Sequence, residues 1–152
     1  MAEYYFVGTL LPSLSLGIPP EISIEKLEVL LRDNLTYHDY QKTMVLRRFY
    51  DILNLRALFL EEEFDPRGEF SVYEMGEALM NHVGLPDYVF EFIERYPKTE
   101  DRLHHFPFLL AKFFQEAENL KDPFLRHYLN FEREMRLVMT AFRAKKLGRD
   151  LS

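Results

Sequence analysis

The chain has 152 residues, no cysteine and a formal net charge of −6 at pH 7. This length suits one domain with a sizeable core, and the lack of cysteine excludes disulfides, thiolate catalysis and sulfur-ligated metal sites. Hydrophobic residues make up 47% of the chain and aromatic residues 15%. That composition excludes an intrinsically disordered protein, because enough apolar surface is available to offset the entropy lost on folding.

Membrane insertion and secretion are both disfavoured by the sequence. The longest apolar runs, such as residues 106–111, are far too short to span a bilayer. Residues 1–4 lack the basic start and long apolar core of a secretory signal. We therefore expect one domain over residues 1–152, located in the cytoplasm.

The charge is distributed unevenly. Residues 132–152 contain six basic and three acidic residues, which leaves about +3 there and about −9 for residues 1–131. A basic carboxyl-terminal segment matches the negative end of a helix dipole, and it would also suit an acidic protein surface. Nucleic acid is disfavoured as a partner, because the acidic remainder of the chain would repel phosphate.

The first twenty residues are apolar but interrupted by two glycines and three prolines. The prolines exclude a central strand and disfavour helix immediately before them. We predict a short helix or extended piece over residues 4–11, followed by irregular chain. Ser23 is then a suitable N-cap for a helix over residues 24–34.

Thr36 and Asp39 have the spacing of a capping box and predict the start of a long helix over residues 37–60. Its charged residues, including Arg56 and Asp51, are expected to face solvent. Its predicted apolar face consists of Tyr37, Tyr40, Met44, Phe49, Ile52, Leu55 and Phe59.

Residues 63–74 allow two interpretations. Residues 65–68 read Asp-Pro-Arg-Gly, which is typical of a type I turn, and Ser71 with Glu74 predicts a capping box for a helix ending near residue 81. The same segment matches part of an EF-hand calcium loop, with Gly, Ser and Glu at its sixth, ninth and twelfth positions. Arg67 occupies a ligand position and opposes calcium, so we favour the turn and keep calcium binding as an alternative.

Prolines shape the next segment. Pro86 predicts the start of a helix over residues 87–96, and Thr99 is expected to cap a further helix that reaches residue 120. Pro107 should kink or split that helix. No segment shows the alternation of a strand between hairpin turns, so the chain is predicted to be all-α.

The last predicted helix spans residues 122–148, with Asp122 as N-cap, Pro123 in the first turn and Gly148 at the end. Its large apolar residues recur in a 4-3-4-3-4 spacing, which predicts a seam packed lengthwise against other helices. These residues are Phe124, Tyr128, Phe131, Met135, Val138 and Phe142. We therefore predict a multi-helix bundle with a long amphipathic C-terminal helix and an irregular N-terminal segment.

No sequence motif indicates catalysis. The five histidines lack zinc-ligand spacing, no serine lies in a nucleophile elbow, and no glycine-rich phosphate loop is present. We expect a protein that is not an enzyme and that has no cofactor or metal.

Two blocks resemble a known family. One is Y-Y-F-V-G-T-L-L-P-S-L-S-L-G-I-P-P, from Tyr4, and the other is Y-Q-K-T-M-V-L-R-R-F-Y-D-I-L-N-L-R, from Tyr40. They resemble an uncharacterised bacterial family encoded among V-type ATPase genes, including those of chlamydiae. Members of that family are longer, which implies that these residues are the amino-terminal part of a larger protein.

Residues 131–148, F-E-R-E-M-R-L-V-M-T-A-F-R-A-K-K-L-G, are also similar to part of the d subunit of V-type ATPases. There an acid-containing stretch leads into L-R-A-K-x-x-G, although Phe142 stands where Leu is usual. The d subunit is a helical spacer between the rotary stalk and the membrane ring and has no active site. The resemblance implies a non-enzymatic structural or assembly component whose partners are V-type ATPase subunits and which contacts the membrane only through that complex.

That role suggests two groups of contact residues. We expect basic contacts near the C-terminus and aromatic contacts near the N-terminus. The candidate interface residues are Tyr4, Tyr5, Phe6, Arg143, Lys145 and Lys146. The alternatives are a generic protein-interaction helical domain and a small-molecule- or calcium-binding helical domain.

Overall fold

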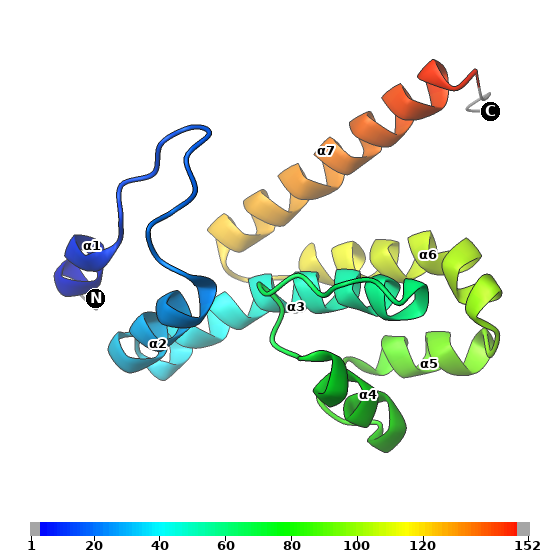
Figure 1. Ribbon diagram of the computed structural model, residues 1–152, viewed down its shortest axis with the longest axis horizontal. Helices are drawn as coiled ribbons and strands as arrows, with labels where there is room; N and C mark the ends of the chain where they lie inside the picture. The colour runs from blue at the N-terminus through cyan, green and yellow to red at the C-terminus, as the bar shows by residue number, and fades with distance from the viewer. Residues whose placement is uncertain (1–3, 149–152) are drawn as a thin grey trace.

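The structure is a computed structural model that describes residues 4–148, and within them it contains seven helices and no strand (Figure 1). Arg149 and Asp150, which were counted in the basic C-terminal segment, lie outside the described residues. The helices are α1 (Tyr5–Leu10), α2 (Ile24–Asn34), α3 (Tyr37–Leu60), α4 (Val72–Asn81), α5 (Asp87–Arg95), α6 (Thr99–Ala117) and α7 (Pro123–Lys146). The predicted all-α class, the irregular N-terminal segment and the long C-terminal helix are confirmed.

Most helix starts follow the predicted caps. The hydroxyls of Ser23 and Thr36 accept hydrogen bonds from backbone N–H groups in the first turns of α2 and α3. Ser71 and Glu74 form the complete capping box of α4. The predicted Thr99 cap is wrong, because Thr99 is already helical and Lys98, the residue before it, makes no side-chain cap.

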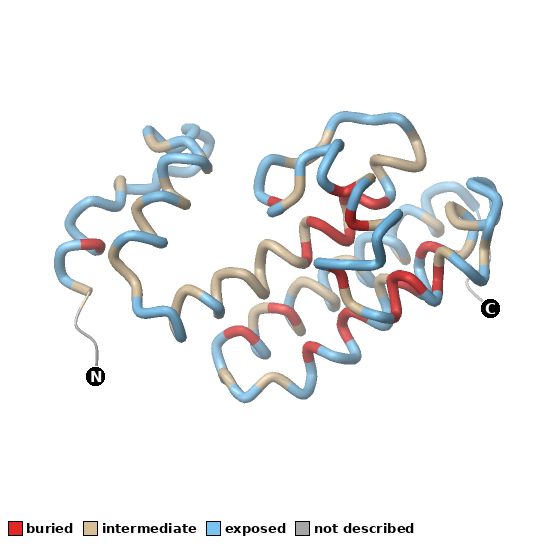
Figure 2. The backbone as a smooth tube through the Cα atoms, turned by 90° about the horizontal axis from the view of Figure 1, so that it is seen from below, coloured by how far each residue is buried: buried red, intermediate tan, exposed pale blue. Residues whose placement is uncertain are grey.

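The hydrophobic core lies where α3, α5 and α6 meet, as the buried segments in Figure 2 show. Phe49 on α3 lies at its centre, with ring centroids 5.5 Å from Phe113 and 5.6 Å from Phe114 on α6. The N-terminal end of the molecule has little core, since Val7 is the only buried residue of α1 and α2 has none. The predicted apolar face of α3 is therefore buried only in its second half.

Helix α6 continues through Pro107, where we predicted a kink or a split. A proline inside a helix costs about 3 kcal/mol, because it removes one backbone hydrogen bond and crowds the preceding turn. Phe106 and Leu109 on either side are buried in the core, and their burial holds the helix together across the proline. Within residues 4–148, no helix is both long and apolar enough to cross a bilayer.

Asp51 was predicted to face solvent, and this is wrong: its side chain is fully buried and holds the loop between α3 and α4. Asp51 Oδ1 accepts hydrogen bonds from the backbone N–H groups of Glu69 (2.7 Å) and Phe70 (3.2 Å). The buried Asn54 makes two hydrogen bonds to the backbone of Asp65. Burial raises the pKa of Asp51, although the two N–H donors act to lower it.

Gly68 closes this contact at the other side. A Cβ at this position would lie 2.6 Å from Asn54 Nδ2 and 2.7 Å from Asp51 Oδ1, well inside van der Waals contact. The two buried polar side chains thus fix the loop only because residue 68 has no side chain. This is a packing requirement, which sequence patterns do not show.

We expect Gly68→Ala to destabilise the protein by about 1–3 kcal/mol, because the added methyl group displaces the buried polar contacts. The matched control is Gly76→Ala in α4, where a Cβ meets nothing within 4 Å. That change should leave stability unchanged or raise it by up to about 1 kcal/mol, since alanine favours helix. Urea unfolding of both variants measures the difference, and equal stabilities would contradict the tight contact at Gly68.

Candidate interaction surface

Helix α7 is attached to the body of the protein by its first two turns. The Asp122 carboxylate caps the helix by accepting hydrogen bonds from the N–H groups of Phe124 (3.0 Å) and Leu125 (3.1 Å). Leu125 and Leu129, one turn apart, are the buried residues of this helix. Beyond them α7 diverges from α6 and leaves the body (Figure 1).

The seam predicted for this helix does not pack against other helices. Tyr128 is half-buried, and the other five residues are exposed, by between 47% for Met135 and 66% for Phe124. We call these five the outer stripe: Phe124, Phe131, Met135, Val138 and Phe142. The prediction of a packed seam is therefore wrong in direction, because the apolar side of α7 faces solvent.

The helical repeat explains which side faces inward. Leu129 is followed, three to seven residues later, by the half-buried Glu132, Arg133 and Arg136, which lie on the same side of the helix. This body-facing side is apolar for two turns and charged afterwards. The apolar spacing located the stripe correctly, but only the fold shows that the described chain provides no helix to cover it.

The diverging part of α7 borders a cleft of about 840 Å³ against α3 and α6, which we call the α7 cleft. Four arginines and two glutamates line it: Arg56, Arg133, Arg136, Arg143, Glu62 and Glu118. Arg133 forms an ion pair with Glu118. The guanidinium of Arg136 lies over the Phe49 ring, 4.9 Å from its centroid.

The candidate basic contacts divide between the two sides of α7. Arg143 lines the α7 cleft. Lys145 and Lys146 are exposed, and they come three and four residues after Phe142, so they flank the end of the outer stripe on both sides. The structure thus places these two lysines beside an apolar surface.

The aromatic candidates lie far from the basic ones, at the opposite end of the molecule in Figure 1. Tyr5 and Phe6 are exposed on α1, as a contact surface would require. Tyr4 is half-buried, and its hydroxyl donates a 2.5 Å hydrogen bond to Asp39 Oδ2. Tyr4 is thus held inside the protein, and the six candidates do not form one site.

A polar network joins three helix starts. The hydrogen bond from Tyr4, with further contributions from Lys42 and Thr36, lowers the pKa of Asp39 to about 2. Lys42 Nζ lies 3.0 Å from Asp39 Oδ1 and 3.2 Å from Asp122 Oδ2, and these carboxylates raise its pKa. The network connects the first turns of α1, α3 and α7, and no sequence signal pairs residues so far apart in the chain.

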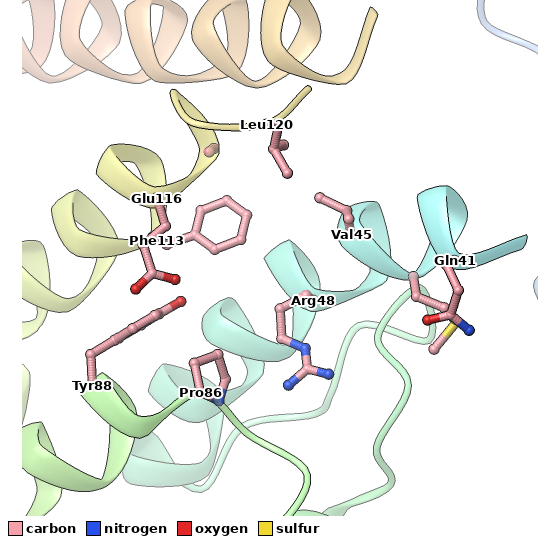
Figure 3. Close-up of a pocket in the computed structure, with 10 residues that line it drawn as sticks. Gln41, Val45, Arg48, Pro86, Tyr88, Phe113, Glu116 and Leu120 are labelled. Carbon is pink, nitrogen blue, oxygen red and sulfur yellow. The ribbon is translucent and has the colours of Figure 1, made fainter. Parts of the chain in front are cut away.

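A second cavity, of about 350 Å³, lies between α3, α5 and α6 (Figure 3). Burial raises the pKa of Tyr88 there, so its phenol stays protonated. Arg48 donates a 2.5 Å hydrogen bond to the backbone oxygen of Gly84, and Glu116 is the one carboxylate in the lining. These groups do not form a nucleophile with its base, nor a pair of carboxylates, as hydrolytic chemistry would need.

The residues of the calcium alternative serve the turn and the helix cap. The Asp65 carboxylate accepts hydrogen bonds from the Arg67 backbone and side chain, and Ser71 and Glu74 are engaged in their capping box. Across residues 4–148, no three His, Asp or Glu side chains are placed to hold a metal ion. The turn interpretation is therefore confirmed.

The comparisons with known proteins identify the family. The family described as "Protein of unknown function (DUF2764)" matches residues 1–152. The chain belongs to this family. No solved structure matches the chain.

Members of the DUF2764 family occur in chlamydiae, which confirms that part of the resemblance. The chain is 28% identical to an uncharacterized protein of Chlamydia trachomatis serovar D, 27% to one of Chlamydia muridarum and 28% to one of Chlamydia pneumoniae. Each match covers the whole chain but only 59% of the relative. None of these descriptions names a V-type ATPase.

We expect Tyr4→Phe to raise the pKa of Asp39 from about 2 toward its ordinary 3.8, because the strongest hydrogen bond to the carboxylate is lost. A carboxylate with a lowered pKa stabilises the fold above pH 3.8, and this contribution disappears as the pH falls to about 2. Carboxyl-carbon NMR titration measures the change. The control is Tyr5→Phe on exposed α1, and the same Asp39 pKa in both variants would contradict the network.

Proposed function

We propose that this protein is a non-enzymatic structural or assembly component that binds other subunits through α7. The observation that carries the proposal is the outer stripe, an apolar surface that follows the length of the helix and faces solvent. Its three phenylalanines, 52% to 66% exposed, alone leave on the order of 300 Å² of aromatic surface accessible. Contiguous apolar patches of this size mark interaction sites.

The spacing of the outer stripe favours a helical partner. Residues at alternating intervals of three and four are those that insert into the holes of a facing helix in a coiled coil. Lys145 and Lys146, at the end of the stripe, add basic contacts beside it. A partner helix with acidic residues at that end would complement both features.

We further propose that the partner is a V-type ATPase. The support is the similarity of residues 131–148 to the d subunit of that complex, since these residues form the diverging half of α7 and contain most of the outer stripe. A stalk component needs a stiff helix and a contact surface, and α7 provides both. Because the chain spans 59% of its relatives, the partners of the whole protein are part of this proposal.

The test is co-purification of the tagged full-length protein from its own host cells, read by mass spectrometry. We expect recovery of V-type ATPase subunits with the unaltered protein and a loss of about tenfold or more with Phe142→Glu, which places a charge in the outer stripe. The matched control is Phe108→Glu on α6, because Phe108 and Phe142 are 67% and 63% exposed.

Two results would contradict this function. Repeated preparations without ATPase subunits would remove the ATPase as partner and leave a generic interaction domain. Equal recovery of partners with Phe142→Glu and with the unaltered protein would show that α7 is not the binding element. Circular dichroism of both variants confirms that the helices remain folded.

A further inference from the structure

We propose that the α7 cleft is a second docking site, which receives an acidic amphipathic helix from a partner protein. This inference rests on the proposed function, since it requires a protein partner. It concerns a different face of α7, however, because Arg136 and Arg143 line the cleft whereas the outer stripe faces away from it. A partner engaged at both faces would hold the free half of α7 from two sides.

The floor of the cleft has the surface relief that a helix requires. Phe106, Leu110 and Phe114 follow one another at intervals of four along α6, and Leu53 and Ala57 do so along α3. Rows with this spacing form the ridges into which a packed helix fits. With α7 diverging on the far side, the cleft is an open apolar groove of the kind that binds amphipathic helices.

The charges of the cleft select the partner. Of its four arginines, Arg133 is neutralised by Glu118, whereas Arg56 and Arg143 form no ion pair with any residue from 4 to 148. Arg136 Nε is buried without a hydrogen-bond partner, and its nearest carboxylate, Glu132, is 3.8 Å away. A groove with an apolar floor and surplus guanidinium groups complements a helix with glutamate or aspartate beside its apolar face.

The shape and overall charge disfavour other partners. A bilayer surface is flat and would meet the convex outer stripe rather than enter a cleft between three helices. A nucleic acid would approach the body of a chain whose first 131 residues carry about −9. Only a rod of roughly helical width fits the groove and neutralises its arginines.

The experiment uses two synthetic helical peptides of about 21 residues with leucine at the a and d positions. One carries glutamate at the flanking positions, and its twin carries lysine there. Because the chain has no cysteine, a fluorophore attached to Ala111→Cys reports from inside the cleft, and one attached to Val138→Cys reports from the outer stripe. We expect the acidic peptide to change the signal at position 111, and the basic twin to bind at least about tenfold more weakly.

A pair of charge reversals provides the matched test. Arg143→Glu lines the cleft, whereas Lys145→Glu makes the same change in charge two residues further on, outside it. We expect Arg143→Glu to weaken binding of the acidic peptide about tenfold at low salt and Lys145→Glu to change it less than about twofold. Equal effects of the two reversals, equal binding of the two peptides, or a signal change only at position 138 would each overturn the cleft assignment. Loss of ATPase recovery with Phe142→Glu, together with any of those results, would leave the proposed function standing without this site.

Discussion

The two-turn attachment of α7 is the constraint on which the rest of the structure depends. Leu125 and Leu129 enter the core, Asp122 caps the helix, and Lys42 links that cap to the start of α3. After Leu129 the body-facing side of the helix becomes charged, so the hydrophobic effect no longer draws it onto α6. The outer stripe and the α7 cleft both follow from this change of character along one helix face.

The core is concentrated where it supports that attachment. The second half of α3, with α5 and α6, buries nearly all of the large apolar residues, and Phe49 connects α3 to α6. The N-terminal helices are instead joined to the body through polar contacts, of which Tyr4 with Asp39 is the shortest. Both ends of the molecule therefore present apolar side chains that the described residues leave uncovered, including Tyr5 and Phe6 at one end and Phe142 at the other.

Local structure was largely predictable from the sequence, because its signals are local. Ser23, Thr36, Ser71 and Asp122 each cap the helix predicted for them, since a cap depends on residues only two or three positions apart. The continuity of α6 across Pro107 was not predictable in this way. It depends on burial of neighbouring side chains against other helices.

The direction in which side chains face was the main failure. The spacing of the outer stripe identifies an apolar helix face but contains no information on whether a partner lies in the same chain. Asp51 looked like a solvated charge because the backbone groups that satisfy it come from Glu69 and Phe70, eighteen and nineteen residues away. Tyr4 was expected at the surface for the same reason, since its partner Asp39 lies 35 residues further on.

The exposure of the outer stripe is tested most directly by thiol labelling of the chain, which has no natural cysteine. Val138 is 64% exposed on α7, and Ala117 on α6 is 7% exposed and accepts a cysteine with little change in volume. At micromolar dilution, we predict that Val138→Cys reacts at nearly the rate of an unfolded-chain thiol and that Ala117→Cys reacts about a hundredfold more slowly. Equal protection of the two thiols would show that α7 lies with its apolar side against the body, and it would contradict the account.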